Sequence, residues 1–194
     1  MSIRAPITPS AFAADRRGVA AVEFALLAPM LVLAYFGLAE LTEGLMAARK
    51  VSSVAASIGD LTAQAASTTP GQISDIFTVG QTLMQPFPTT GQVLTMRISS
   101  VTVDANNVPR IDWSEGQGMT ALPKGAAVSL PLATKAQPSD PSTPFIASGQ
   151  SVIMAEAHYQ FVSPVGRYLP QTSDLNDTLY LSPRQGTSVT CSSC

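Results

Sequence analysis

The longest apolar stretch of the chain runs from Val19 to Ala39 and contains a single charge, Glu23. A helix of about 20 residues rises about 30 Å, which is the thickness of the hydrocarbon core of a bilayer. The stretch therefore predicts a membrane-spanning helix over residues 19–39, with a kink at Pro29, where the backbone loses one hydrogen bond. Because Arg16 and Arg17 precede it, its N-terminal side is predicted to be cytoplasmic and the bulk of the chain periplasmic or extracellular.

The predicted helix continues beyond the membrane. Apolar residues recur there at alternating spacings of three and four, which is typical of a helix with one buried stripe. The stripe consists of Val51, Val54, Ile58, Leu61 and Ala65. We expect one helix over residues 19–66, ended by the polar run from Ser67 to Gly71, and a folded extracytoplasmic domain over residues 67–194.

A second, shorter amphipathic helix is predicted next. Its apolar positions are Ile73, Ile76, Phe77, Gly80, Leu83 and Met84. Thr69 and Pro70 suit its N-terminus, and Asp75 is expected in its first turn. Pro86 and Pro88 are predicted to end it.

From residue 93 the apolar period changes to two, which indicates strands. The apolar set shifts after Ile98, so a bulge is predicted near Ser99 and Ser100. A turn at residues 106–107 leads to a partner strand in which Ile111 and Trp113 alternate with polar residues.

Three further segments complete the predicted sheet. Strands are expected over residues 126–132, 151–162 and 178–182, and the proline-containing stretch 134–149 is expected to be a loop. The elements add up to an α+β fold. A long N-terminal helix packs on an antiparallel sheet that has one wet face, and one short extra helix is added.

Composition narrows the class of function. Of the 194 residues, 45% are hydrophobic and 12% are charged, and the formal net charge is −2. Soluble domains usually have about 25% charged residues. No basic stripe is interleaved with aromatic residues, which argues against nucleic-acid binding. Residues 1–18 are polar and positively charged, which is typical of a targeting leader.

The start of the apolar stretch resembles a prepilin-type signal, and specifically the TadE-like pseudopilins of tight-adherence (Flp-type) pilus systems. The resemblance covers roughly residues 16–45 and rests, besides the two arginines, on Gly18, Glu23, Phe24, Ala25 and Pro29. It implies a pilin-like fold and cleavage by a prepilin peptidase between Gly18 and Val19. Glu23 would then be the fifth mature residue, a position that the family keeps acidic. Flp-type major pilins more often have Tyr where this chain has Phe24, and they are very short, so the large C-terminal domain points to a minor pilin or pseudopilin.

The chemistry of these residues agrees with that implication. Gly18 has no Cβ, which lets the backbone approach a protease closely. Cleavage would place an α-ammonium on Val19, and Glu23 lies one helical turn further on the same face. We therefore expect Glu23 to serve assembly by meeting its own N-terminus or that of a neighbouring subunit.

The predicted role is assembly of an adhesive pilus rather than catalysis, with no cofactor. The implied partners are the bacterial inner membrane, the prepilin peptidase, other pilin or pseudopilin subunits and the pilus assembly machinery.

Two alternatives remain for the N-terminal stretch. Glu23 can be an interfacial charge on an ordinary signal anchor, because the cost of inserting a charge shrinks near the interface. A secretory signal can be cleaved after Ala39, since Gly37 and Ala39 are small, and this would release a periplasmic binding or enzymatic domain. Glu23 within the apolar stretch and the continuing helix argue against cleavage there.

The only cysteines, Cys191 and Cys194, form a C-x-x-C in the terminal tail. A redox role would need this motif at a helix N-terminus, so a small-loop disulfide is predicted instead. His158 could add a third metal ligand, or pair with Glu156 as acid and base. As the only histidine, with no nucleophile motif nearby, it is predicted to be a surface residue, and no metal site is expected.

Overall fold

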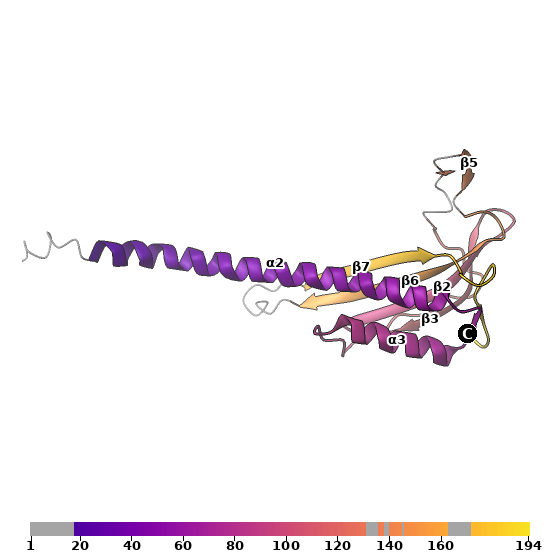
Figure 1. The fold of residues 1–194 in the computed structure, drawn as a ribbon, viewed down its shortest axis with the longest axis horizontal. Coiled ribbons are helices and arrows are strands. Elements are labelled where there is room, and N and C mark those ends of the chain that lie inside the picture. Colours follow the sequence, from indigo (N-terminus) through magenta and orange to yellow (C-terminus); the bar gives the residue numbers. More distant parts are fainter. Residues whose placement is uncertain (1–17, 131–135, 138–139, 145, 163–171) are drawn as a thin grey trace, which may run out of the picture. The chain divides into compact units, whose positions relative to one another are not determined.

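The computed structural model describes residues 18–130, 136–137, 140–144, 146–162 and 172–194 (Figure 1). The chain divides into two compact units, residues 1–42 and 43–194. Helix α2 begins in the first unit and ends in the second. In chain order, the elements are α2 (Val19–Ala63), β1 (Ser67–Thr68), α3 (Pro70–Met84), β2 (Leu94–Val103), β3 (Pro109–Gln117), β4 (Ala136–Gln137), β5 (Asp140–Pro144), β6 (Ser151–Val162), β7 (Thr172–Leu181) and β8 (Thr190–Cys191).

The second unit has two layers. Its sheet contains four antiparallel strands in the order β3-β2-β6-β7. The C-terminal half of α2 and the whole of α3 lie on one face of this sheet (Figure 1). The predicted α+β fold, with a long apolar helix, a short second helix and an antiparallel sheet, is confirmed.

The second half of α2 buries one face against the sheet. Its buried residues are Ala47, Val51, Val54, Ala55, Ile58, Gly59, Thr62 and Ala63. The prediction for Leu61 was wrong, because this side chain is 39% exposed and Thr62, four residues after Ile58, continues the buried face instead. The helix ends at Ala63, three residues earlier than expected.

Helix α3 begins with a reciprocal capping box. The Gln72 amide donates to Thr69 Oγ1 at 3.3 Å, and the Thr69 amide donates to Gln72 Oε1 at 3.0 Å. Pro70 is the first helical residue, where its missing N–H leaves no gap in the helix. The expectation that Asp75 lies in the first turn was wrong: the first turn has no acid, and Asp75 is one turn further along.

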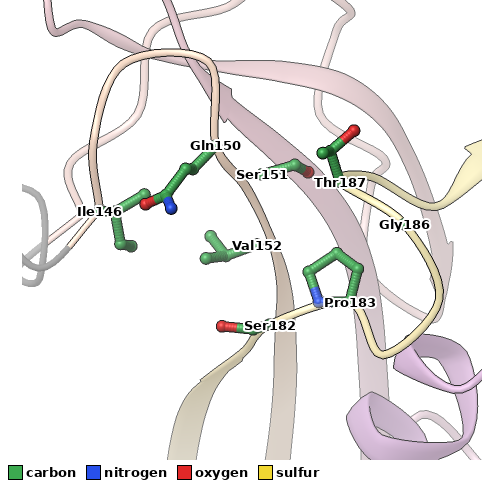
Figure 2. A pocket seen from close by; sticks show the side chains of 8 residues that line it. All are labelled: Ile146, Gln150, Ser151, Val152, Ser182, Pro183, Gly186 and Thr187. Carbon is green, nitrogen blue, oxygen red and sulfur yellow. The ribbon is translucent and has the colours of Figure 1, made fainter.

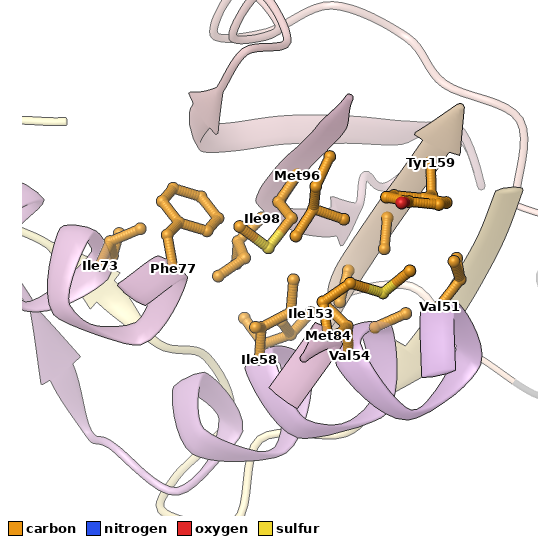
Figure 3. Packing of buried hydrophobic residues seen from close by; sticks show 14 of the residues in the cluster. Val51, Val54, Ile58, Ile73, Phe77, Met84, Met96, Ile98, Ile153 and Tyr159 are labelled. Atoms are coloured by element: carbon orange, nitrogen blue, oxygen red, sulfur yellow. The ribbon is translucent and has the colours of Figure 1, made fainter. Parts of the chain in front are cut away.

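The main core lies between the two helices and the sheet (Figure 3). Figure 3 shows Val51, Val54 and Ile58 of α2 and Ile73, Phe77 and Met84 of α3 facing Met96, Ile98, Ile153 and Tyr159 of the sheet. The Lys50 ammonium donates to the Leu83 carbonyl at 2.9 Å, which ties α2 to the last turn of α3. Lys50 thus satisfies a carbonyl that has no partner within α3.

The predicted bulge lies on the partner strand rather than on β2. Strand β2 pairs with β6 without any shift, and the register shift with β3 falls between Ser100 and Val101, which face Trp113 and Ile111. The extra residue is Asp112. The apolar set of β2 therefore changes face after Ile98 although the strand itself stays regular.

A second core cluster occupies the opposite face of the sheet. It consists of Val101, Val103, Ile111, Leu130, Ile146, Val152 and Met154, with Leu122, Ala126, Val128 and Tyr180 packed against it. The expectation of one wet face was therefore wrong for this end of the sheet.

The strand expected over residues 126–132 is also a correction. Residues 125–128 run along β3 with an isolated bridge between Arg110 and Ala127, and Leu130 is buried. The segment bonds to β3 at a few backbone positions and does not form a regular strand. Leu132 lies outside the described residues.

The remaining strands differ from expectation mainly in extent. Strand β6 spans 151–162, as predicted. Strand β7 begins at Thr172 rather than at residue 178, because it pairs with β6 up to Val162. The stretch expected to be a loop contains the short antiparallel pair β4–β5, and the parallel pair β1–β8 was not foreseen.

Candidate processing and assembly segment

The N-terminal end of α2 places Gly18 directly before the first helical residue, Val19. Gly18 is exposed, and a Cβ added to it would meet no atom of the described residues within 4 Å. Its backbone is not in the left-handed region that favours glycine. The described structure therefore sets no steric requirement for glycine at this position.

Glu23 lies on the exposed surface of the first turns of α2. It is four positions after Val19, so the two share one helix face about 6 Å apart along the axis, at about 1.5 Å per residue. Val19 is 51% exposed, and Val22 and Phe24 on either side of Glu23 are 67% and 68% exposed. A carboxyl side chain is thus set in an apolar surface.

Exposed apolar side chains continue along the helix. They are Val19, Val22, Phe24, Leu26, Leu27, Met30, Leu31, Val32, Leu33, Tyr35, Phe36, Leu38, Leu41, Leu45 and Met46. A soluble protein rarely exposes such a contiguous patch, and α2 is long and apolar enough to cross a membrane. This one apolar helix fits a single-pass membrane anchor.

Pro29 stands inside α2, and the helix is continuous on both sides of it. The bend expected there remains a prediction. Arg16 and Arg17 lie outside the described residues.

The cysteine pair lies at the end of the second unit. Cys191 and Cys194 are joined as a disulfide, with their Cα atoms 5.7 Å apart. Neither residue lies in a helix. Among the described residues, no three His, Cys, Asp or Glu side chains gather as a metal site.

The Glu156 carboxylate faces Arg97 on the neighbouring strand. It accepts from Arg97 Nε at 2.6 Å and from Nη2 at 2.9 Å, and Arg97 Nη1 also donates to the Thr120 carbonyl at 3.0 Å. Both charged side chains are more than four-fifths buried. A carboxylate held by two guanidinium hydrogen bonds is committed to structure. Burial, and then the Glu156 charge, raise the pKa of the neighbouring Tyr180 hydroxyl.

His158 has a different neighbour from the one considered in the sequence. Its Nε2 is 3.9 Å from Asp174 Oδ1 on β7, and its side chain is 31% exposed. Glu156 is occupied by Arg97, so the structure does not bring Glu156 and His158 together as an acid–base pair.

A pocket of about 300 Å³ opens near the turn before β6 (Figure 2). It is lined by Ile146, Gln150, Ser151, Val152, Ser182, Pro183, Gly186 and Thr187. These lining side chains carry no charge.

Sequence reasoning missed the contacts of the C-terminal segment with the end of α2. The Arg184 amide donates to the Ala63 carbonyl at 2.8 Å, and the Arg184 guanidinium pairs with Asp60. The Gln185 amide side chain donates to the Gln64 carbonyl at 2.9 Å. The chain separation of more than 120 residues hides these pairs, although a helix end always leaves carbonyls that need donors.

Comparison with protein-family models matches residues 18–59 to the family described as TadE-like protein. Neither the comparison with curated proteins nor that with solved structures gave a match. The matched stretch begins at Gly18, contains the whole membrane-length apolar run and ends within the buried half of α2. The stretch from Gly18 to Gly59 is therefore TadE-like, as the resemblance predicted, and it indicates a component associated with the tight-adherence pilus.

Proposed function

We propose that the chain is a pseudopilin that takes part in assembling a tight-adherence pilus after a prepilin peptidase cuts between Gly18 and Val19. The mature chain would be a single-pass protein of the bacterial inner membrane. Its N-terminus would lie at the cytoplasmic side, and its C-terminal domain would be periplasmic or extracellular. It would work through contacts with other pilin or pseudopilin subunits and the assembly machinery, not as an enzyme.

The observation that carries this proposal is the position of Glu23. It is the only charged residue in the exposed apolar stretch 19–39 of α2, and it lies one turn from the residue that would become the N-terminus. An ionised carboxylate inside a bilayer costs on the order of 2.5–3.5 kcal/mol at the helix centre, so it needs a favourable partner. A new ammonium at Val19, or the same group on a neighbouring subunit, supplies one.

The leader is the second support. A cut after Gly18 would remove the positively charged residues 1–18 and leave α2 to begin at the new N-terminus. Gly18 is exposed, and no atom of the described residues lies within 4 Å of a Cβ added to it, which supports access by a protease. The family match also begins at Gly18.

N-terminal sequencing of the protein purified from its native membrane tests the processing step. We expect the mature chain to begin at Val19. A chain beginning at Glu40 would show cleavage by a secretory signal peptidase and would overturn the proposal. A chain that keeps Met1 would be an ordinary signal anchor and would overturn it as well.

Variants at the two possible cleavage sites test the same processing step without purification of the protein. Gly18→Leu should accumulate the longer precursor on an immunoblot, because a bulky side chain blocks close approach of the protease. Gly37→Ala is the matched control, since it changes another exposed glycine of α2 with open space around it, and it should be processed normally. Loss of processing in Ala39→Leu, with normal processing in Gly18→Leu, would instead identify the secretory site.

A further inference from the structure

The last eleven residues, 184–194, form a segment that holds the corner between α2 and α3, and we call this segment the C-terminal clasp. Figure 1 shows it in yellow beside the end of α2. Its contacts form two levels: residues before the cysteines contact the end of α2 and the sheet, and residues around the cysteines contact the linker after α2.

The first level consists of several hydrogen bonds, an ion pair and a buried side chain, all from residues that precede the cysteines. The Arg184 amide and guanidinium bind the Ala63 carbonyl and the Asp60 carboxylate. Val189 is buried in the main core, and its carbonyl accepts from Trp113 Nε1 at 2.7 Å. These contacts do not depend on the state of the sulfurs.

The second level contains the cysteines and consists of few contacts. Strand β8 pairs with β1 through two residues only, Ser67 with Thr190 and Thr68 with Cys191. The Thr190 amide donates to the Ala66 carbonyl at 3.3 Å, and the Ser192 amide donates to the Thr68 carbonyl at 3.2 Å. Two long hydrogen bonds give this two-residue pairing little protection against opening by themselves.

The disulfide closes a small ring around this weak end. Ser192 lies inside the ring between Cys191 and Cys194, so ring closure positions the amide that binds Thr68. Ser193 has a φ of 79°, in the left-handed region, which is unfavourable for a non-glycine residue. The ring between Cys191 and Cys194 holds Ser193 in this conformation.

The corner connects directly to α3. Thr68 is 3% exposed, and the next residue, Thr69, is the N-cap whose reciprocal bonds with Gln72 start the helix. Backbone motion at Thr68 would therefore also move the capping box and the first buried residue of α3, Ile73.

We propose that the Cys191–Cys194 disulfide is a redox latch: when it is closed, residues 190–194 are fixed on the α2–α3 corner, and when a dithiol reduces it, the corner and the N-terminal turn of α3 become mobile. In the opening step the dithiol supplies two electrons and two protons. The S–S bond breaks, each cysteine sulfur takes up one proton, and the dithiol becomes its own disulfide. Cys194 is exposed, so a thiol can reach the bond. An oxidising exterior keeps the latch closed.

Amide hydrogen exchange on the purified full chain in detergent tests the latch, with oxidised protein compared with protein held in excess dithiothreitol. We expect the peptide covering residues 188–194 and the peptide covering 64–73 to exchange at least tenfold faster after reduction. Peptides from β2 and β6 should not change, because the upstream contacts of the clasp stay in place.

Two variants make the result specific. The double change Cys191→Ser with Cys194→Ser should show the fast exchange without reductant and no further response to it. Thr190→Ala is the matched control, because it removes an exposed side chain of β8 and keeps its backbone bonds, and it should behave like the unmodified chain.

Equal protection in the oxidised, reduced and double-variant proteins would overturn the latch. Loss of protection throughout the sheet would overturn it as well, since the disulfide would then support the whole domain. Exchange is measured on the purified chain, so neither outcome depends on whether the proposed processing at Gly18 occurs.

Discussion

Ile111 and Trp113 are two residues apart in β3, yet they lie on opposite faces of the sheet. Trp113 pairs with Ser100 and belongs to the core beneath the helices, whereas Ile111 pairs with Val101 and belongs to the second cluster. Asp112 is the extra residue between them. A regular strand would place both on one face, so the bulge lets a single hairpin supply two cores.

Asp112 holds this bulge with its side chain, and its removal should be costly. Its carboxylate accepts from Ser100 Oγ at 3.3 Å and from Thr102 Oγ1. We expect Asp112→Ala to lower the free energy of unfolding by about 1–3 kcal/mol, since the Ser100 and Thr102 hydroxyls lose the side-chain acceptor that Asp112 provides. Urea unfolding of the full chain in detergent, followed by Trp113 fluorescence, measures this. Glu115→Ala, which removes another acid of β3, should change the stability by less than about 0.5 kcal/mol; equal losses in both variants would contradict the role of Asp112.

Gly59 marks the closest approach of α2 to the sheet. A Cβ at this position would lie 2.5 Å from Leu181 Cδ1 and 2.9 Å from Ala155 Cβ. Alanine is favoured over glycine in a helix by about 1 kcal/mol, but overpacking a core costs about 1–3 kcal/mol. Because Ala155 is a short side chain on a central strand and cannot turn aside, we expect Gly59→Ala to destabilise the domain by up to about 2 kcal/mol in net terms.

The control for this change is Gly71→Ala in α3, where the nearest atom to a new Cβ is Thr69 Oγ1 at 3.9 Å. It should be neutral or slightly stabilising in the same urea measurement. A Gly59→Ala protein as stable as the Gly71→Ala protein would show that the helix can move away from the sheet.

Asp104 should make the stability of the domain depend on acid pH. The Val108 amide, the Arg110 guanidinium and the Asn106 amide donate to its carboxylate and hold its pKa below the usual range. A carboxyl with a lower pKa in the folded state stabilises the fold above its unfolded pKa of about 3.9, and this contribution is lost as the pH falls through the lower folded value. We expect Asp104→Asn to lose stability at pH 7 and to reduce the fall in melting temperature below about pH 4.

Melting followed by circular dichroism between pH 2 and pH 7 measures the effect. The comparison is with Asp177→Asn on β7, whose pH profile should follow that of the unmodified chain. Parallel profiles for Asp104→Asn and the unmodified chain would show that the hairpin end does not contribute to the pH dependence.

Glu23 should separate processing from assembly. Because Glu23 lies past the proposed cut and Gly18 is unchanged, we expect Glu23→Ala to yield a mature chain beginning at Val19 in normal amounts. Assembled pili, counted by electron microscopy, should be lost, since the ammonium of Val19 no longer meets a carboxylate in the membrane. Glu43→Ala, beyond the apolar stretch, is the control and should assemble. Normal pili in Glu23→Ala would remove the role proposed for this carboxylate.

Local patterns determined most of the elements. The apolar run to Ala39 and the stripe through Ile58 predicted one continuous helix, and Thr69 with Pro70 fixed the start of α3. The period of two predicted β6 to its final residue. Gly18 and Glu23 also carried the resemblance to the TadE-like family, because that resemblance rests on a short linear motif that needs no folded context. Such features depend on neighbouring residues and backbone geometry alone, so the sequence reveals them.

Only the tertiary structure decided which face each strand residue occupies and what the chain ends contact. The change of apolar face at Val101 was interpreted as a bulge near Ser99 and Ser100, but β2 pairs with β6 in an unbroken register, and Val101 belongs to a second core that was not predicted. The Asp60–Arg184 pair and the β1–β8 pairing join residues more than 100 positions apart, and nothing in either segment encodes its partner. Register and long-range pairing depend on the closure of the whole core, which is why they appear only after the helices are set on the sheet.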